Sequence, residues 1–537
     1  MNTETIDCIV VGYNDSSFDA LFQKTARYKD TSGGFRHLMA NSLVFGGKRV
    51  KYADVLNLCL ERATGKPSRR HVGQMANLGA CYLTSFLKAR GYEAELVNFF
   101  NHERDRFADL LAGKVRMVAI TTTYYFEPEP IQELVQFVRE HNEDAIVIVG
   151  GPHIFNLCTD YRHDPRLLRS LLAQMGADVY VFDSQGELTL GHICGELRGI
   201  RPDISQIPNL LYSTDGWETM CQTPRKIENN DMNLNAVNWS HFGSELVVPT
   251  VQTRTARSCA FKCAFCRYPV MAGSLDLVDL DLVEKELDYF QSTGVRYLLF
   301  IDDTFNIPEP RFKELCRRMI ARRYDFQWFS YFRCANADDE CFDLMARAGC
   351  KGVFLGIESG DQDVLRVMRK AAKVDRYLHG IKMLNERGII TYSSFIVGHP
   401  GETFDTVHNT FEFIEQAQPS FYCLESFFFD PKTPIGTQTA EHQLEGAGYR
   451  WKHKGMDWTQ AADLVELGYR SIRGSTVLPL YSFDLWSFAY LLGTGVEEAK
   501  LTKFLQSASD IMVGTINDPA YCTPEREQKL EAIFRPH

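Results

Sequence analysis

Three cysteines in one short segment have the spacing of a metal-cluster site. Cys259, Cys263 and Cys266 follow a C-x3-C-x2-C pattern. Three thiolates on so short a loop can bind three irons of a 4Fe-4S cubane, and without a nearby fourth cysteine one iron stays open to a small molecule. A structural zinc site usually has two separated pairs of Cys or His ligands, which this loop alone does not offer. The pattern therefore indicates a cluster that does chemistry, and the alternative is three reduced cysteines in a loop.

The other cysteines and the start of the chain indicate a reducing compartment. The chain has 15 cysteines, an odd number, and most are scattered in apolar segments, as expected of reduced core residues. The N-terminus has no signal sequence, and no stretch of about 18 apolar residues occurs. We therefore expect a cytoplasmic protein without a membrane partner.

Length and composition are those of a multidomain globular protein. The 537 residues are 45% hydrophobic and 24% charged, which is enough chain for about three domains. The net charge of −11, with no block of lysine or arginine, argues against a nucleic acid as the principal partner.

The elements before the cysteine loop alternate between strands and helices. Apolar runs predict strands near residues 7–13, 95–99, 115–121, 145–149 and 179–182, and helical spacing predicts helices over 78–91, 130–141 and 165–175. This order is typical of a doubly wound parallel sheet, in which ligands bind beyond the carboxyl ends of the strands. Residues 16–73 lack clear periodicity, so we expect an insertion or a cap there.

Small or hydrogen-bonding residues follow these predicted strands. They would let a large planar ligand approach the backbone, and the alternative is a set of ordinary turns. The candidates are Asn14, Thr121, Thr122, Thr123, Gly150, Gly151, Pro152, Ser184, Gln185, Gly186 and Glu187.

A second α/β region surrounds the cysteine loop. Strands are predicted near residue 250, where the loop follows the first strand, and at 298–301, 327–331, 353–357 and 391–396, with helices between them. About six such units predict an open, partial (β/α)6 barrel. We therefore expect an α/β protein with a Rossmann-like domain over 1–215, a linker over 216–245, the barrel over 246–430 and a mainly helical C-terminal domain over 431–537.

The loop at residues 257–269 resembles the cluster loop of the radical S-adenosylmethionine (SAM) enzymes. Residues 300–306, 356–360 and 396–403 resemble the strand ends of that family that reach the amino group, the ribose and the adenine of SAM. The resemblance implies a 4Fe-4S cluster whose open iron binds SAM. The SAM-binding residues that it implies are Asp302, Asp303, Glu358, Ser359, Val397 and Gly398, with Arg333, Arg369 and Lys370 as candidates for the SAM carboxylate.

The N-terminal half resembles the cobalamin-binding Rossmann domain of one large radical SAM subclass. Residues 78–91, 119–123, 149–153 and 185–187 carry this resemblance. The sequence lacks the Asp-x-His-x-x-Gly motif that places a histidine under cobalt, so we interpret His153 and His192 as structural residues. The strand-end candidates above are then the expected cobalamin contacts.

Over nearly its whole length the chain resembles the P-methyltransferase family of phosphinothricin tripeptide biosynthesis. The resemblance implies that SAM provides both a methyl group, carried by cobalamin, and a 5′-deoxyadenosyl radical that removes hydrogen from an unactivated P–H or C–H centre. It also implies a small-molecule or peptide substrate and an external electron donor of the flavodoxin or ferredoxin type. The shared residues surround the cofactors, so they do not identify the substrate.

Two alternative functions remain open on the sequence. One is a radical epimerase or another non-methylating rearrangement, for which Cys334 or Cys423 is a candidate hydrogen donor. The other is a non-catalytic cobalamin or iron–sulfur sensor, although nothing resembles a DNA-reading helix-turn-helix or an output domain.

Overall fold

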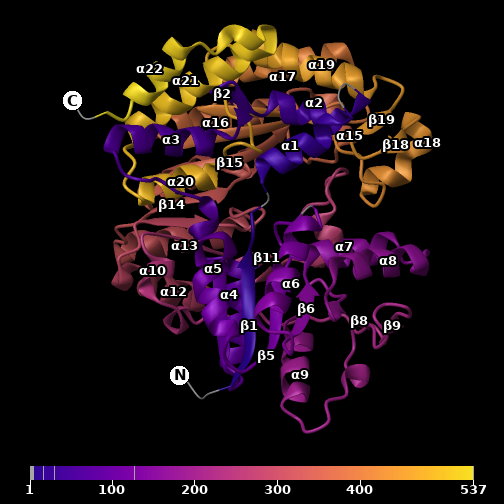
Figure 1. Cartoon of the computed structure of the whole chain (residues 1–537). Helices are drawn as coiled ribbons and strands as arrows, with labels where there is room; N and C mark the ends of the chain where they lie inside the picture. The colour runs from indigo at the N-terminus through magenta and orange to yellow at the C-terminus, as the bar shows by residue number, and fades with distance from the viewer. Residues whose placement is uncertain (1–4, 16, 29–30, 126, 536–537) are drawn as a thin grey trace. The chain divides into compact units, whose positions relative to one another are not determined.

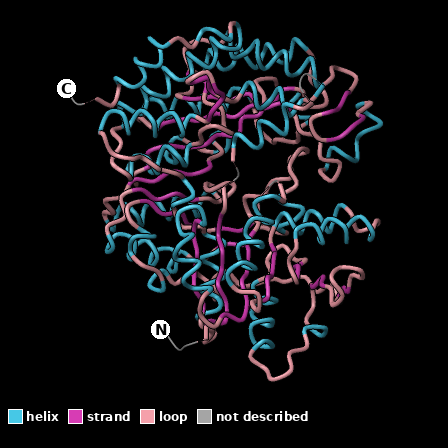
Figure 2. Tube along the Cα trace, in the orientation of Figure 1, coloured by secondary structure: helices cyan, strands magenta, loops and turns pink. Residues whose placement is uncertain are grey.

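A computed structural model describes residues 5–15, 17–28, 31–125 and 127–535. The chain forms two compact units. A long segment that interrupts the first unit in the sequence belongs to the second unit. Residues 1–16 and 73–247 make the first unit, and residues 17–72 and 248–537 make the second. In both units the strands run between layers of helices (Figures 1 and 2). In the described part of the chain, no helix has the length and apolarity needed to cross a membrane.

The first unit contains a seven-stranded sheet in the order β4-β1-β5-β6-β7-β8-β9. The first five strands pair in parallel, and the last two pair antiparallel. The strands are β1 (Ile6–Tyr13), β4 (Ala94–Phe99), β5 (Val115–Thr121), β6 (Ile146–Gly150), β7 (Val179–Val181), β8 (Leu210–Tyr212) and β9 (Cys221–Gln222). The chain passes from β1 to β4 on one side and then to β5 on the other, so the ends of β1 and β5 form the topological switch point where ligands bind in such sheets.

Helices cover both faces of this sheet because its central strands are apolar on both sides. Ile9 packs in a core with Phe107 and Leu134, whereas the neighbouring Cys8 contacts Cys194 on the opposite face. The helices are α4 (Leu78–Lys88), α5 (Phe100–Leu111), α6 (Glu129–His141), α7 (Pro152–Asp160), α8 (Pro165–Met175), α9 (Glu187–Leu197) and the short α10 (Ser244–Val247). The predicted doubly wound fold is confirmed.

The second unit is built on a parallel sheet in the order β10-β13-β14-β15-β16-β17-β20. Its strands are β10 (Thr250–Thr253), β13 (Tyr297–Phe300), β14 (Gln327–Tyr331), β15 (Cys350–Glu358), β16 (Ile390–Val397), β17 (Phe421–Ser426) and β20 (Thr476–Val477). The intervening helices are α11 (Tyr268–Ala272), α12 (Leu280–Thr293), α13 (Glu309–Arg322), α14 (Asp339–Arg347), α15 (Gln362–Val367), α16 (Val374–Glu386) and α17 (Phe404–Ala417). This is the predicted open barrel, extended by the short strand β20.

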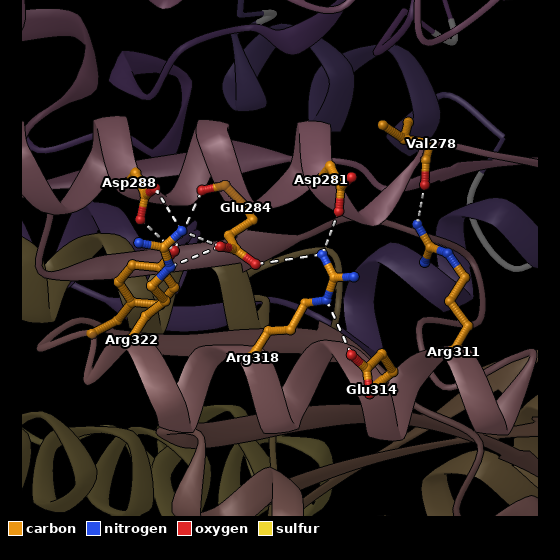
Figure 3. Close-up of polar contacts among 9 residues, drawn as sticks. Val278, Asp281, Glu284, Asp288, Arg311, Glu314, Arg318 and Arg322 are labelled. Carbon is orange, nitrogen blue, oxygen red and sulfur yellow. Dashed lines mark hydrogen bonds and ion pairs between the residues drawn. The ribbon is translucent and has the colours of Figure 1, made fainter.

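Ion pairs join the two outer helices that follow the cysteine loop. Arg318 of α13 lies 2.7 Å from Asp281 and 3.4 Å from Glu284 of α12, and Arg322 Nε donates to Glu284 at 2.7 Å (Figure 3). Arg311 of α13 donates to the carbonyl of Val278 at 2.5 Å and to the hydroxyl of Thr255 at 3.1 Å. Exposed ion pairs contribute little each, whereas Arg311 helps to hold the backbone at Thr255, which leads into the loop.

The C-terminal segment packs on the barrel, and the insertion packs on the C-terminal helices. The insertion consists of α1 (Phe18–Ala26), α2 (Gly33–Ala40), the hairpin β2 (Leu43–Phe45) and β3 (Lys48–Val50), and α3 (Tyr52–Thr64). The C-terminal elements are α18 (Thr439–His442), the hairpin β18 (Glu445–Ala447) and β19 (Arg450–Lys452), α19 (Trp458–Ser471), α20 (Leu485–Gly493), α21 (Glu498–Asn517) and α22 (Pro524–Ala532). The apolar helix α20 contacts β10, β13 and β15.

These contacts divide the chain differently from the ranges expected from the sequence. Residues 17–72 fall inside the expected domain 1–215, but they pack with the barrel because α2 lies against α19. Residues 431–537 were expected as a separate domain, but α19 and α20 bury their apolar faces on the barrel strands. The aperiodic pattern of the insertion gave no signal for this partner.

Candidate active site

The cysteine loop leaves the end of β10 and leads into α11. Cys263 is buried, and Cys259 and Cys266 are half-buried. Burial raises the pKa of Cys266 to about 11, and the neighbouring thiols Cys263 and Cys259 add to this shift, so the three side chains lie near one another. Binding to a cluster would remove the proton, because a coordinated thiol is deprotonated outright.

The arrangement of the three thiols suits a cubane better than a single ion. Among the described residues no group of three or more His, Cys, Asp or Glu side chains converges on one metal ion. In a cubane each thiolate binds a different iron, so Cys259, Cys263 and Cys266 need only surround the cluster. The residues present therefore fit the 4Fe-4S cluster that the spacing predicts.

The middle of the loop is anchored by two distant segments. Ala264 N donates to the carbonyl of Met368 at 2.8 Å, and Ile435 N donates to the carbonyl of Ala264 at 2.8 Å. Before the first cysteine, Ser258 has a positive φ of 71° and its hydroxyl donates to Gly273 at 2.6 Å. These contacts fix the path of the loop from both sides.

Arg333 lies beside the loop with unused donors. Its side chain is buried, and its guanidinium carbon is 3.5 Å from the ring centroid of Phe261, which lies between Cys259 and Cys263. Within the described residues, Arg333 Nε and Nη2 are buried and have no hydrogen-bond partner. A buried guanidinium in this state needs an anion, and a carboxylate matches its paired donors. Arg333 therefore has the free donors that the predicted contact with the SAM carboxylate requires.

Glu358 and Lys370 are brought together at the end of β15. Lys370 Nζ donates to Glu358 Oε1 at 2.8 Å, and both side chains are buried. Lys370 Nζ also lies 5.7 Å from the ring centroid of Phe265 in the cysteine loop. Arg369 is exposed. Lys370 thus neutralises Glu358 beside the loop, which leaves Arg333 as the better candidate for the SAM carboxylate.

Asp302 supports the backbone that enters the loop. Its Oδ1 accepts a hydrogen bond from Thr255 N at 2.8 Å, and its buried Oδ2 has no partner among the described residues. Burial raises the pKa of Asp302 to about 7, and the charge of Arg311 opposes this rise. The neighbouring Asp303 is exposed. Asp302 therefore positions the loop through the backbone of Thr255 and keeps one oxygen open.

A buried carboxyl group shapes the turn after β16. Glu402 Oε2 accepts hydrogen bonds from Gly398 N at 2.6 Å and from His399 N at 3.0 Å. Gly398 has a φ of 98°, and a Cβ there would lie 2.4 Å from the ring of Trp451. Val397 and Gly398 are therefore held in one backbone path. The sequence did not single out Glu402 for this role.

Ser359 is fixed by the helix behind it. Its buried Oγ lies 3.3 Å from Thr410 Oγ1, and Asp361 N donates to the same Oγ at 3.1 Å. The next residue, Gly360, packs so closely on α17 that a Cβ would lie 2.8 Å from the backbone of Thr410. Ser359 thus serves to hold the end of β15 against α17.

In the first unit the predicted candidates meet at the ends of β1, β5 and β6. Thr121 Oγ1 donates to Gly12 O at 2.8 Å, and Thr122 Oγ1 donates to Gly150 O at 2.8 Å. Gly151 has a φ of 106°, and a Cβ there would lie 2.9 Å from Thr122 Oγ1. The ends of β1, β5 and β6 are therefore packed closely together, and only glycine fits at position 151.

Asn14 follows β1 at the same sheet edge. Its side chain is buried, and Nδ2 donates to Pro130 O at 3.1 Å and to Glu133 Oε2 at 3.0 Å. The exposed ring of Tyr124 follows β5 and lies 5.7 Å, edge to face, from the ring of Tyr13. An exposed aromatic ring beside backbone that only glycine can form suits a large planar ring such as the corrin of cobalamin.

Gln185 and Glu187 form hydrogen bonds with residues 228–230, which lie in the segment that was expected to be a linker. Gln185 Nε2 donates to Glu228 O at 3.1 Å, and Asn230 N donates to Gln185 Oε1 at 2.8 Å. Asn230 Nδ2 also donates to Glu187 Oε2 at 2.9 Å. Residues 228–230 therefore complete the end of β7, which the aperiodic sequence gave no means to predict. Thr123, Ser184 and Gly186 lie in the turns at the same sheet edge, and Pro152 begins α7 there.

Comparison with known families separates the same two regions. Residues 253–414 match the Radical SAM superfamily, and residues 70–187 match the B12 binding domain. The chain therefore contains a radical SAM domain and a B12-binding domain. At the level of these two domains, the predictions of an α/β fold, of an enzyme and of a 4Fe-4S cluster, SAM and cobalamin as cofactors are confirmed.

Relatives of this enzyme have several activities. An uncharacterized methyltransferase of Pyrococcus horikoshii is 24% identical over 56% of this chain and 63% of its own length, so the match spans less than two thirds of that relative. An anaerobic magnesium-protoporphyrin IX monomethyl ester cyclase of Cereibacter sphaeroides is 24% identical over 84% of this chain and 75% of its own. A cytidylyl-2-hydroxyethylphosphonate methyltransferase of Streptomyces wedmorensis is 23% identical over 70% and 82%.

Solved structures share the fold. The radical SAM methyltransferase TsrM of Kitasatospora setae aligns with a TM-score of 0.54 at 21% identity, over 68% of this chain and 73% of that chain. The cobalamin-dependent radical SAM enzyme OxsB aligns with a TM-score of 0.53 at 15% identity, over 85% and 68%. None of these names is that of the phosphinothricin family, so the resemblance to that family stays a prediction.

Proposed function

We propose that this protein is a cobalamin-dependent radical SAM methyltransferase that methylates an unactivated phosphinate phosphorus or carbon centre of a small natural-product intermediate. The observation that carries this proposal is the cysteine triad with the unpaired, buried guanidinium of Arg333 beside it. When bound, the cluster, SAM and cobalamin supply an organic radical and a transferable methyl group. The protein itself supplies binding, orientation and exclusion of water.

Binding and orientation fall to described residues. Arg333 holds the carboxylate of SAM, and Asp302 holds the backbone before Cys259 so that the triad keeps its geometry. Glu402 and Gly398 fix the turn on which the adenine rests. Asn14, Thr122 and Gly151 form the edge of the sheet on which cobalamin binds.

The relatives favour methyl transfer and give a substrate class. Two of the three relatives described above are methyltransferases, and one acts on a phosphonate, as its name states. We propose that the substrate of this protein belongs to a similar class, a small molecule with a phosphorus or carbon centre that accepts the methyl group. A reduced flavodoxin or ferredoxin delivers the electron.

A non-methylating radical reaction is the second candidate, and one side chain favours it. Cys423 lies on β17 with a buried thiol whose pKa is raised well above its ordinary value by burial, so it keeps the S–H bond that a hydrogen donor needs. Cys334, the other candidate, packs against the backbone of α16 at Gly380. Cys423 is therefore the better donor if the reaction is an epimerisation.

Isotopes in SAM and in the solvent separate the two candidates. The reconstituted, cobalamin-loaded protein is reduced anaerobically and given CD3-labelled SAM with phosphinate, amino-acid and peptide acceptors. We expect a product that carries the CD3 group. Uptake of solvent deuterium without the CD3 group, lost in Cys423→Ala, would instead establish the non-methylating reaction.

A further inference from the structure

The end of β17 presents a carboxyl group to the interior of the barrel. Tyr422 lies 6.3 Å, ring to ring, from Tyr469 of α19, and the side chain of Leu424 packs against Gly468 of the same helix. Side chains alternate along a strand, so Cys423 and Glu425 face the opposite side, away from α19. Glu425 is the second-to-last residue of β17 and therefore lies at the carboxyl end of the barrel.

A histidine from the insertion meets this carboxyl group. His37 Nε2 of α2 lies 3.4 Å from Glu425 Oε2. Asn41 Nδ2 donates to the carbonyl of His37 at 2.8 Å, which identifies that atom as the amide nitrogen because a carbonyl only accepts. The same Nδ2 lies 3.3 Å from His37 Nδ1, which must then accept. The ring proton of neutral His37 is therefore on Nε2, facing Glu425.

The helix that carries His37 is held firmly on the barrel. Arg36 pairs with Asp463 at 2.7 Å and with Glu466 at 2.6 Å on α19. The hydroxyl of Ser482 donates to the carbonyl of Asn41. The insertion thus places one side chain at a fixed point beside β17.

Glu425 keeps one oxygen without a partner. Its Oε1 is buried and has no hydrogen bond within the described residues, although the thiol of Cys423 lies close enough to lower the pKa of the carboxyl group, and no lysine or arginine of that part of the chain pairs with it. Burial raises the pKa of Glu425 to about 7 and lowers that of His37 to about 4, so His37 is neutral and supplies no charge. Glu425 is half-buried, and a carboxylate with one buried oxygen and no cation is costly unless a ligand completes it.

We propose that Glu425, oriented by His37, binds a protonated amine of the substrate. This inference rests on the proposed function and specifies its substrate class, an amine-bearing acceptor. An ammonium group supplies both the positive charge and the donors that Oε1 lacks. An anionic group at this point would instead require Glu425 to be protonated and to donate.

The test uses the full-length protein loaded with cluster and cobalamin, methyl-labelled SAM, and the small-molecule extract of cells that contain the protein as the acceptor source. We expect the labelled product to be retained on a cation exchanger at neutral pH. Acetylating the amines of the extract beforehand should abolish labelling, since an amide carries no charge. A labelled product that is not retained, and that still forms after acetylation, would overturn the inference.

Substitutions test the same contact within the protein. Glu425→Gln keeps the shape and removes the charge, so we expect the KM for the retained acceptor to rise about 10- to 100-fold, the range of a hydrogen bond to a charged group. Glu425→Asp should recover part of this loss. The control is Glu412→Gln, because Glu412 is exposed on α17. Iron and cobalamin contents show whether each variant is folded.

The outcomes distinguish a failure of the amine contact from a failure of the proposed methyl transfer. Equal KM values for Glu425→Gln and the wild type, with full cofactor content, would contradict the amine contact while methyl transfer itself stands. If Glu425→Gln loses its cofactors, His37→Phe and His37→Gln take its place. We expect Phe to raise the KM and Gln, which can still donate to Glu425, to change it less than about threefold, and equal values for both would contradict the inference. If the wild type labels no compound, the proposed function fails and the amine contact fails with it.

Discussion

Lys370 Nζ lies 2.8 Å from Glu358 Oε1, and both side chains are buried beside the cysteine loop. Glu358 ends β15 in a backbone conformation with a φ of 71°, which a non-glycine residue rarely adopts. The pair therefore holds a strained strand end in place, and each partner removes the cost of burying the other.

Removing one partner should destabilise the second unit strongly. Lys370→Met leaves Glu358 as an unpaired buried carboxyl group, which costs about 3 kcal/mol. For a unit of this size we expect the Tm to fall by about 4 °C. Lys370→Met combined with Glu358→Gln should recover part of the loss. If Lys370→Met has the same Tm as the wild type, the pair contributes nothing to stability.

Arg333 should control SAM affinity. Arg333→Gln removes the donors that face no partner in the described structure, so we expect the Kd for SAM to rise about 10- to 100-fold. Equilibrium dialysis with labelled SAM measures this directly. Arg369→Gln, at an exposed position two residues past α15, is the matched control and should bind SAM as the wild type does. If the affinity for SAM falls equally in both variants, SAM responds to the positive charge of this region in general and not to a specific contact with Arg333.

Cobalamin binding should depend on the backbone at Gly151. Gly151→Ala forces a Cβ to within 2.9 Å of Thr122 Oγ1 at a φ of 106°, so we expect cobalamin uptake to fall at least tenfold while iron content stays normal. Gly91→Ala has a similar backbone penalty at a φ of 77° but no atom within 4 Å, and it should bind cobalamin normally. Cobalamin absorbance per protein is the measurement, and normal uptake by Gly151→Ala would contradict the placement.

Glu402 should make stability depend on pH. Burial raises its pKa to about 8 from the ordinary 4.5. The folded protein therefore holds this proton more tightly than the unfolded chain, and the contribution of Glu402 to stability falls as the pH rises from about 4.5 to about 8. Glu402→Gln keeps an acceptor for Gly398 N and cannot titrate. We expect the Tm of the wild type to drop relative to this variant between pH 5.5 and 8, and parallel Tm curves would show that Glu402 does not titrate in this range.

The sequence predicted the elements well because their signals are local. Central strands such as β1, β5 and β6 are continuous apolar runs, and the spacing of Cys259, Cys263 and Cys266 predicts a cluster loop without any tertiary information. Arg333 was also a candidate from the sequence, because a cation near a predicted strand end is visible there, and its contact with SAM stays a prediction.

The remaining features depend on contacts between distant segments. Residues 17–72 pack on the barrel through Arg36 and the two acidic residues of α19, more than 400 positions away, and no periodicity reports such a partner. The Lys370 and Glu358 pair, and the use of Gln185 by residues 228–230, likewise appear only once the chain is folded. His37 lies in a segment without helical pattern, so its approach to Glu425 had no signal in the sequence.

The central claim is that the triad and the B12-binding unit act in one methyl transfer, and product stoichiometry tests it most directly. In the reduced, cobalamin-loaded wild type, 5′-deoxyadenosine and S-adenosylhomocysteine should each accumulate in proportion to methylated product, which means two SAM molecules for each methyl group transferred. Cys263→Ala should form neither 5′-deoxyadenosine nor methylated product while it still binds cobalamin. Methylated product from Cys263→Ala, or wild-type 5′-deoxyadenosine without S-adenosylhomocysteine and methylated product, would contradict this account.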